Sequence, residues 1–240
     1  VLGGGPIGCE LAQAFQLLGS QVTLVEMGPR LLANEDPDTS ALLQNQLRKD
    51  GVDLRLNHTA ERFSVNADGE ARLHAQHEGT AVELPFERVL IALGRQPNIQ
   101  GFGLEQLGIE VDRTVKVNAL LQTNFPNIYA CGDVAGPYQF THVASHQAWY
   151  AAVNALFDPF KTFKADYSVI PWVTYTTPEI ANVGLTEQAA QQQQIDYEVI
   201  EYDISDMDRA IADQQAYGRI KVLTVPGKDK ILGVNIVVAQ

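Results

Sequence analysis

The chain has 240 residues, of which 45% are apolar, and a formal net charge of −12. An acidic surface repels phosphates, which excludes nucleic acid and anionic membrane surfaces as partners. The sequence holds no apolar run of the roughly 18 residues that a membrane span requires, so we expect no membrane insertion. The two cysteines, Cys9 and Cys131, have neither Cys-x-x-Cys nor Cys/His spacing. This usage predicts free thiols, no metal site and a reducing, cytoplasmic location.

A glycine-rich turn opens the chain, where residues 3–8 read Gly-Gly-Gly-Pro-Ile-Gly and fit the G-x-G-x-x-G dinucleotide fingerprint. The first glycine makes the tight turn, the second lets backbone approach a pyrophosphate, and the third lets the helix pack on the strand. Only two residues of the preceding strand are present, so we expect this chain to be a segment of a longer polypeptide. The predicted cofactor contacts of this turn are Gly3, Gly5, Pro6, Ile7 and Gly8.

The residues after the turn complete the pattern that the fingerprint requires. Apolar residues recur at helical spacing at positions 7, 11, 14, 15 and 18, and Gly19 is placed to end that helix. Residues 22–25 then predict a strand that ends on Glu26, about 20 residues beyond the first glycines. Glu26 would accept hydrogen bonds from both ribose hydroxyls and would repel a 2′-phosphate, which favours NAD over NADP. The alternative is a helix and strand with an incidental glycine loop and a surface glutamate.

The next segments predict an α/β fold with a Rossmann-like NAD-binding domain. Residues 36–51 predict a helix and residues 52–56 a strand. Residues 63–75 predict a hairpin around Asn66-Ala67-Asp68-Gly69, and a third short strand follows residues 77–79, so a β-meander is inserted here. Residues 89–93 are continuously apolar, which predicts a central parallel strand covered on both faces.

A second glycine and acid pair follows an apolar stretch. Residues 125–133 predict a strand that ends in Gly132-Asp133, followed by a loop and a long apolar helix over residues 142–157. An aspartate at the carboxyl end of a parallel strand lies where cofactor hydroxyls bind in open α/β sheets. The alternative interpretation is a strand-terminating turn without a ligand.

Taken together, these motifs resemble the FAD-dependent pyridine nucleotide-disulfide oxidoreductases, a family that includes dihydrolipoamide dehydrogenase and mercuric reductase. The segments that carry the resemblance are residues 3–10, 91–98, 123–136 and 175–187. They imply an NAD-binding domain at 1–96, the returning part of an FAD-binding domain at 97–164, and an α+β dimerisation domain at 165–240. Within the last, strands are expected at 173–175, 197–202, 219–224 and 231–238.

The resemblance also implies the cofactors FAD and NAD, a small-molecule substrate and a homodimer. Glu10 matches the acid that pairs with a lysine beside the flavin, and Asp133 matches the acid that binds the ribityl chain. The other implied cofactor contacts are Gly94, Arg95, Gly132 and Ala135. The redox cysteine pair and the His-Glu pair of the family have no match in these residues, so the chain alone is expected to be inactive.

Two questions stay open at the level of sequence. The pair Glu26-Met27 resembles dihydrolipoamide dehydrogenases, whereas residues 10–15 and 208–210 also resemble mercuric reductases. Pro6 stands where several relatives carry an aromatic residue over the flavin. A nucleotide-binding dimerisation module without redox chemistry is the alternative to an enzyme.

Overall fold

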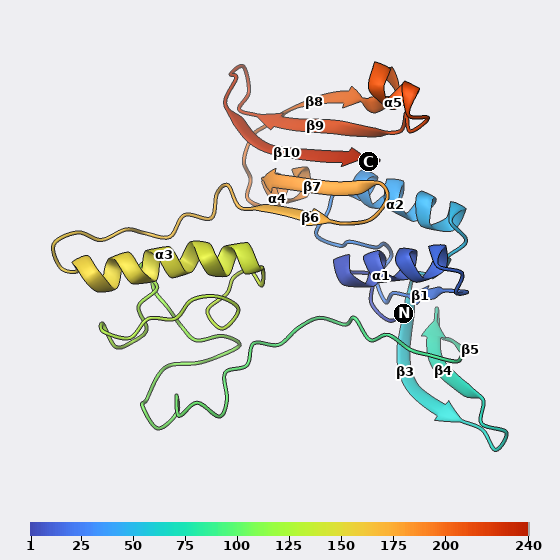
Figure 1. Cartoon of the computed structure of the whole chain (residues 1–240), viewed down its shortest axis with the longest axis horizontal. Coiled ribbons are helices and arrows are strands. Elements are labelled where there is room, and N and C mark those ends of the chain that lie inside the picture. Colours follow the sequence, from blue (N-terminus) through green and yellow to red (C-terminus); the bar gives the residue numbers. More distant parts are fainter. Residues whose placement is uncertain (240) are drawn as a thin grey trace. The chain divides into compact units, whose positions relative to one another are not determined.

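The computed structural model describes residues 1–239. It divides the chain into two compact units. We call residues 1–94 together with those from 171 onward the first unit, and residues 95–170 the second unit. Figure 1 labels most of their helices and strands. Among the described residues, none of the helices has the length and apolar character needed to cross a membrane.

A small parallel sheet forms the nucleotide-type half of the first unit. Strand β1 (Thr23–Val25) pairs in parallel with β2 (Asp53–Arg55), and Leu2 forms parallel bridges to Val25 and to Ile91. Helix α1 (Pro6–Leu17) follows the glycine turn. Because parallel strands joined by a helix define the Rossmann pattern, the predicted fold class is confirmed for this part.

The buried face of α1 is not the apolar stripe that the helical spacing suggests. Its buried residues are Gly8, Cys9, Ala12 and Gln13, whereas Ile7 and Phe15 of the stripe are more than 40% exposed. Small residues face the sheet because the helix runs close to it at the turn. The sequence periodicity therefore identifies the helix but not the side that packs.

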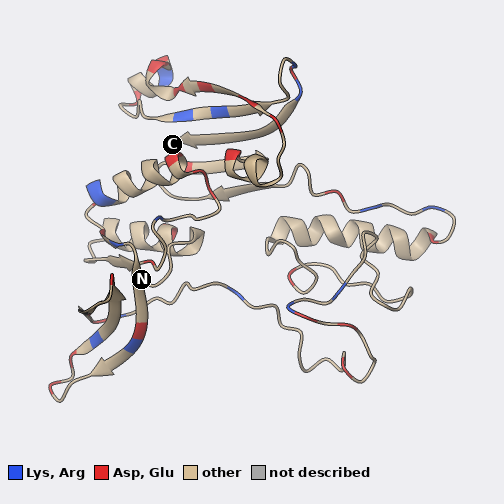
Figure 2. Cartoon of the chain, turned by 180° about the vertical axis from the view of Figure 1, so that it is seen from behind, with Lys and Arg blue, Asp and Glu red and all other residues tan. Residues whose placement is uncertain are grey.

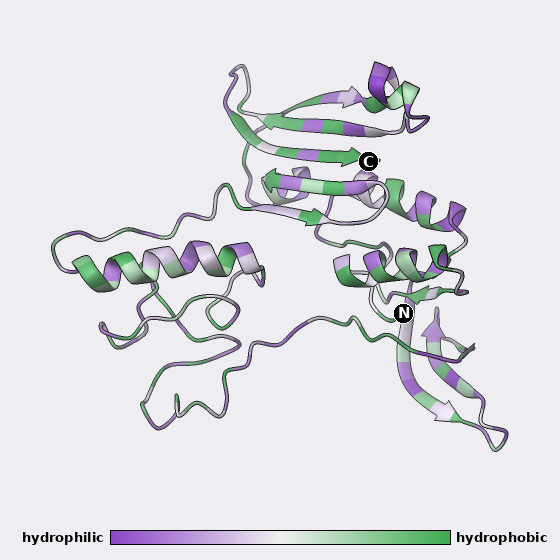
Figure 3. Ribbon diagram, in the orientation of Figure 1, coloured by the Kyte–Doolittle hydropathy of each residue, from purple (hydrophilic) through white to green (hydrophobic). Residues whose placement is uncertain are grey.

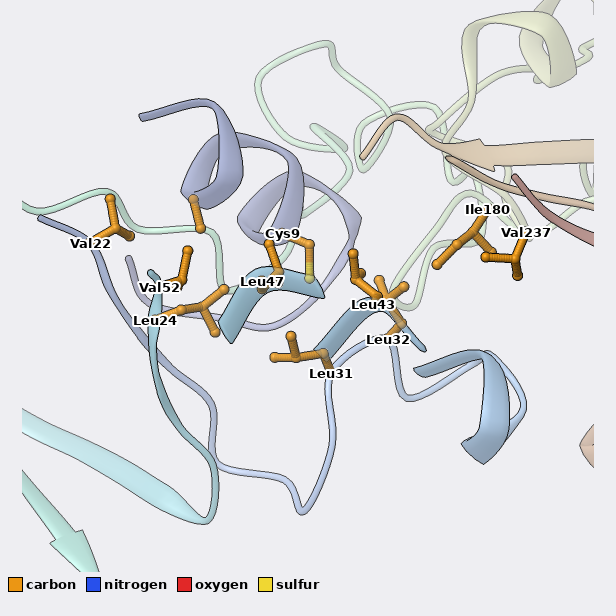
Figure 4. Close-up of a cluster of buried hydrophobic side chains, with 11 residues drawn as sticks. Cys9, Val22, Leu24, Leu31, Leu32, Leu43, Leu47, Val52, Ile180 and Val237 are labelled. Carbon is orange, nitrogen blue, oxygen red and sulfur yellow. The ribbon is translucent and has the colours of Figure 1, made fainter. Parts of the chain in front are cut away.

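Helix α2 (Pro37–Lys49) closes the core of this half. Its Leu43 and Leu47 are fully buried, and each contributes roughly 1.5–3 kcal/mol by leaving water. The cluster to which they belong (Figure 4) comprises Cys9, Ala12, Val22, Leu24, Leu31, Leu32, Leu43, Leu47, Val52, Ile180 and Val237. The last two come from the C-terminal part of the chain, so one core joins both stretches of the first unit.

The predicted β-meander is confirmed as a three-stranded antiparallel sheet. It runs β3 (His58–Val65), β4 (Ala71–His77) and β5 (Thr80–Phe86), in that spatial order. The expectation for residues 89–93 is wrong, because only Ile91 forms a bridge and Leu93 is 69% exposed. A continuous apolar run predicts a strand covered on both faces only if other elements pack on both faces. Among the described residues, no element covers the second face of residues 89–93.

The C-terminal stretch forms a five-stranded antiparallel sheet in the order β6-β7-β10-β9-β8. Four strands lie close to the predicted ranges: β6 (Pro171–Thr174), β8 (Glu198–Asp203), β9 (Gly218–Thr224) and β10 (Ile231–Val238). Strand β7 (Glu179–Gly184) is not anticipated by the sequence analysis. Burial alternates along β10, where Gly233, Asn235 and Val237 are buried, although most residues of the strand are apolar (Figure 3). Three short helices complete this part: α4 (Glu187–Gln192), η1 (Ile204–Asp206) and α5 (Asp208–Ala212).

The second unit has a different construction, since its described residues form one helix and no extended strand. Helix α3 (Thr141–Phe157) confirms the helix predicted for this region. The strand predicted at 125–131 is wrong, because only Tyr129 pairs, in an isolated bridge to Gln122. Loops therefore make up most of this unit, and α3 supplies the groups that hold them.

Candidate nucleotide-binding sites

The opening turn has backbone contacts that only glycine permits at two of its positions. Gly3 adopts a φ of +101°, and a Cβ there would lie 2.4 Å from the carbonyl oxygen of Ala92. At Gly8, a Cβ would lie 1.9 Å from the carbonyl oxygen of Gly3. Both glycines are therefore required by the packing of the turn itself.

Gly5 differs from its two neighbours in the fingerprint. Its conformation is extended, and a Cβ built on it would meet nothing within 4 Å. The protein thus leaves open the position at which the fingerprint brings backbone against a pyrophosphate. A methyl group at this position would fill the space that the ligand needs.

Helix α1 begins directly at this open position. Pro6 occupies its first turn, and its N-terminus has no hydrogen-bonded side-chain cap. The first N–H groups of a helix lack partners within the helix and, with the dipole, attract anions. The turn, the open Gly5 and the uncapped helix therefore fit a dinucleotide phosphate.

Glu26 lies at the end of β1 and contacts the turn directly. Gly4 donates its backbone N–H to Oε2 at 2.7 Å, and Gly28 donates to Oε1 at 2.6 Å. The side chain therefore braces the glycine turn, a contact that the sequence analysis does not anticipate. Each carboxylate oxygen has two lone pairs, so Glu26 can still accept hydrogen bonds from ribose hydroxyls.

Glu10 and Gln13 join α1 to the C-terminal part of the first unit. Tyr175 donates its backbone N–H to Oε1 of Glu10 at 2.9 Å. Gln13 accepts from the N–H of Thr177 and donates to its carbonyl oxygen, both at 2.7 Å. These bonds fix the segment after β6 on the helix that begins at the nucleotide turn.

The other predicted cofactor residues lie at or beyond the boundary between the units. Gly94 ends the first part of the first unit with a φ of +116°, and Arg95 donates to the carbonyl oxygen of Gln139. In the second unit, Gly132 and Ala135 share one tight turn, closed by an N–H of Ala135 that donates to the carbonyl oxygen of Gly132. Asp133 in the same turn is exposed. The structure thus places Gly132, Asp133 and Ala135 in one turn of the second unit, apart in sequence from the opening turn of the first.

Both cysteines are free thiols. Cys9 is buried, and burial together with the charges of Glu10 and Glu26 raises the pKa of its thiol to about 12. Because the thiolate is the nucleophile, this thiol is inert. Cys131 borders an apolar cavity of about 350 Å³ in the second unit.

One carboxylate cluster of the first unit has the spacing of a cation site. Oxygens of Asp38, Glu187 and Glu201 lie within 4.8 Å of one another. The ammonium of Lys221 contacts all three, at 2.6 Å from Asp38, and therefore occupies the place that a cation would take. Blue bands along β9 in Figure 2 mark its basic residues.

Comparisons with known proteins match the chain over nearly its whole length. The family model described as pyridine nucleotide-disulphide oxidoreductase matches residues 1–148, and the model of its dimerisation domain matches residues 170–240. The chain spans about half the length of the curated relatives it matches, as the shares below show.

Two relatives and one solved structure illustrate the range of similar proteins. A dihydrolipoyl dehydrogenase from Bacillus subtilis is 37% identical over 238 residues, which cover 99% of this chain and 51% of that protein. A mercuric reductase from Lysinibacillus sphaericus is 35% identical, covering 99% of this chain and 43% of that protein. The HOCl-induced flavoprotein disulfide reductase RclA from Escherichia coli aligns with a TM-score of 0.86 at 30% identity, over 100% of this chain and 54% of that one.

Proposed function

This chain belongs to the pyridine nucleotide-disulphide oxidoreductase family. We propose that it is part of a flavin-dependent oxidoreductase acting on a sulfur group. In that protein it would form the pyridine-nucleotide site, part of the FAD site and the dimerisation domain. The family is FAD- and NAD(P)-dependent. The observation that supports the proposal most directly is the open Gly5 position between a braced turn and an uncapped helix.

The proposed domains are residues 1–96 for NAD, 97–164 for FAD and 165–240 for dimerisation. The turn at Gly3, Gly5, Pro6, Ile7 and Gly8 would hold the NAD pyrophosphate through backbone N–H groups. When bound together, the two cofactors supply hydride exchange between nicotinamide and flavin.

Glu10 is the proposed catalytic residue, acting as a negative charge beside the flavin. Its bond from Tyr175 holds the carboxylate in one orientation. In the second unit, Asp133 would accept hydrogen bonds from flavin hydroxyls, with Gly94, Arg95, Gly132 and Ala135 shaping the surrounding backbone.

NAD is the proposed nucleotide, because the Glu26 carboxylate is fixed at the turn by two backbone donors. A 2′-phosphate would approach a like charge that cannot swing away without releasing the turn. Dihydrolipoamide oxidation is the proposed reaction class of the parent protein, supported by two dihydrolipoyl dehydrogenases that are 37% and 39% identical to this chain. We place the parent protein in the cytoplasm as a homodimer. Mercuric-ion reduction is the second candidate, supported by a 35% identical relative.

Replacing Gly5 with alanine tests the nucleotide site. We expect Gly5→Ala to abolish binding of ADP-ribose in calorimetry while the thermal midpoint stays unchanged, because the methyl meets no protein atom. Gly8→Ala is the contrasting variant, expected to destabilise the fold itself by its clash with Gly3. Unchanged ADP-ribose affinity in Gly5→Ala would contradict the proposed site.

Glu26→Gln tests the nucleotide preference with the smallest change in shape. The unaltered chain should bind ADP-ribose more tightly than 2′-phospho-ADP-ribose, and the variant should narrow that ratio because the repelling charge is lost. Tighter binding of the 2′-phosphate form by the unaltered chain would refute the NAD assignment.

The 240-residue chain is also expected to lack lipoamide turnover and a flavin absorption band, since only one glycine-acid FAD motif is present.

A further inference from the structure

Two histidines of the β-meander lie opposite each other where β3 begins. His58, the first residue of β3, is paired with His77, the last residue of β4. A bulge between Ala60 and Arg62 produces this pairing, since the register beyond the bulge, continued without it, would place Thr59 opposite His77. Directly opposite side chains have their Cβ atoms about 4.5–5.5 Å apart. The strand register therefore brings together two rings whose spacing in the sequence indicates no site.

The two imidazole rings are stacked on each other. Their centroids are 4.1 Å apart and their planes are inclined by 10°. His58 is 7% exposed, and His77 is half-buried. The preceding positions on the same face of β4, Ala75 and Leu73, are buried. An apolar surface therefore borders the pair, and such a shell limits the access of water to histidine ligands in metal sites.

Each ring has one nitrogen that is fixed by the backbone. Nδ1 of His58 lies 2.7 Å from the carbonyl oxygen of Leu56, and Nδ1 of His77 lies 3.1 Å from that of Asn57. A carbonyl oxygen only accepts, so each Nδ1 carries a proton and each neutral ring has its lone pair on Nε2. Histidines that bind metals are oriented in the same way, by a hydrogen bond from the second nitrogen to a carbonyl or carboxylate.

Both Nε2 atoms are available to a cation. Neither forms a hydrogen bond with any described residue, and neither is among the fully buried atoms without a partner, so solvent reaches both. Leu56 and Asn57 are consecutive residues of one turn, and both Nδ1 atoms face that turn. The two Nε2 atoms therefore lie at the edge of the stack that faces away from the turn.

We propose that His58 and His77 form a binding site for a late first-row divalent cation, such as Zn²⁺ or Cu²⁺, held by both Nε2 atoms with water as the remaining ligands. Neutral imidazole suits these ions, whereas Mg²⁺ and Ca²⁺ prefer oxygen. Two nitrogens on one tetrahedral zinc ion lie about 3.3 Å apart. Rings stacked at 4.1 Å reach that spacing when rotation about χ2 turns the two lone pairs toward each other. The net charge of −12 favours the approach of a cation.

The pair lies where the meander joins the parallel sheet. The N–H of His58 donates to the carbonyl oxygen of Glu26 at 3.0 Å, and the N–H of Asn57 donates to that of Gly28 at 2.9 Å. A bound ion would therefore fix the end of β4 to the start of a strand that is itself bonded to the end of β1. The site uses no residue of the glycine turn, so Gly5→Ala should retain the cation. This variant separates failure of the cation site from failure of the nucleotide site.

His74 provides a matched control on the same strand. Its Nε2 lies 2.7 Å from Ser64 Oγ, and its Nδ1 lies 3.4 Å from Arg62 and 3.3 Å from Glu83 Oε1. Three residues separate it from His77, so its side chain lies on the opposite face of β4. Both of its ring nitrogens are engaged, and neither is left for an ion.

The test is a titration of the 240-residue chain with Cu²⁺, followed by calorimetry and by electron paramagnetic resonance. We expect one tightly bound Cu²⁺ per chain, with hyperfine coupling to two nitrogens. His58→Asn and His77→Asn each keep a side-chain N–H in the place of Nδ1 but lack Nε2, and each should weaken binding at least about tenfold. His74→Asn should leave the affinity unchanged.

Two further measurements decide the proposal if one of these variants fails to fold. His77→Phe keeps a ring for the stack and removes its nitrogens, so it should lose the ion as His77→Asn does. In ¹⁵N spectra, both rings should carry their proton on Nδ1, and Zn²⁺ should shift both Nε2 resonances. Coupling to a single nitrogen, an affinity unaffected by His77→Asn and His77→Phe, or protons on Nε2 would overturn the proposal.

Discussion

The first unit buries charged side chains, whereas the buried polar side chains described in the second unit are all neutral. Lys221 of β9 is fully buried and contacts carboxylates from the start of α2, Asp36 and Asp38, and from α4, Glu187. In the second unit, the fully buried polar side chains are Gln147 and Asn154 of α3. The two units thus solve the same problem, holding backbone segments together, with different chemistry.

The difference follows from the hydrogen-bonding groups of the two side chains. Gln147 accepts from the N–H of Gly132 and donates to the carbonyl of Gly136, so one neutral side chain holds both ends of a loop. An amide that offers both a donor and an acceptor can therefore organise loops without strands. Lys221 only donates, and it needs ionised partners from two other elements. The stability of the first unit should accordingly depend on pH more strongly than that of the second.

The chain offers one tryptophan reporter in each unit. Trp172 lies on β6 of the first unit, and Trp149 lies on α3 of the second. Trp149→Phe and Trp172→Phe therefore give versions in which fluorescence follows one unit at a time. This matters because a protein of two units need not unfold in a single step.

The largest expected effect is that of Lys221→Met in the first unit. Removing the ammonium leaves the carboxylates of Asp36, Asp38 and Glu187 close together without a cation, which costs about 3–5 kcal/mol. Urea unfolding followed through Trp172 should show this loss, with Lys228→Met, an exposed lysine between β9 and β10, as the control. A loss in the free energy of unfolding smaller than that of Lys228→Met would show that the Lys221 contacts do not stabilise the first unit.

The next effect is that of Gln147→Leu in the second unit. The change leaves the N–H of Gly132 and the carbonyl of Gly136 buried without their partner, at a cost of about 2–3 kcal/mol. Urea unfolding followed through Trp149 should show it. Ser145→Ala, an exposed position on the same helix, is the control. An equal response at Trp172 would contradict the independence of the two units.

A smaller effect is expected from pH, and it should be stronger in the first unit. Burial would raise the pKa of Asp38, but hydrogen bonds from Arg219 and Lys221 outweigh it and hold that pKa below its usual value. The resulting stabilisation is complete above the ordinary pKa of 3.8 and is lost as pH falls further. Amide hydrogen exchange in α2 should therefore accelerate below about pH 4 more than exchange in α3. Equal acceleration in both helices would contradict the comparison.

The smallest effect has the opposite sign and concerns Glu35. Burial raises the pKa of Glu35, and the hydrogen bond from Trp172 offsets only part of that shift. An acid with a raised pKa in the folded state destabilises the protein at neutral pH, and the cost disappears as pH falls to the unfolded value. Glu35→Gln should therefore add about 1 kcal/mol at pH 7 and nothing near pH 4, measured by urea unfolding. A stability loss at pH 7 would show that the carboxylate is needed as an acceptor.

The features that the sequence predicts best are those whose residues all lie within a few dozen positions of one another. The glycine turn, α1, β1 and Glu26 follow one another, and the meander is marked by Asn66-Ala67-Asp68-Gly69 between alternating strands. The pairing of His58 with His77 lies within the same short stretch but depends on strand register. A bulge near Ala60 and Arg62 shifts that register, and sequence does not show it.

What sequence does not predict depends on partners that are far apart in the chain. Strand β7 carries a buried Asn182 that accepts a hydrogen bond from Asn235 of the neighbouring strand β10. A polar residue at a buried position hides the apolar alternation by which a strand is recognised in sequence. Lys221 and Asp36 are separated by 185 residues. Residues 89–93 and 125–131 show the reverse error, because their apolar runs suggest strands that the described residues do not complete.

Glu26 carries a consequence for redesigning the cofactor preference. Its carboxylate holds the backbone of both Gly4 and Gly28. The loop after Gly28 leads on to Leu32, whose N–H donates to the carbonyl of Gly4. An exchange to arginine would supply a cation for NADP and at the same time remove two acceptors from the loop. Engineers who want an NADP-dependent form will therefore need a second substitution that accepts the Gly4 N–H before the new charge can be placed.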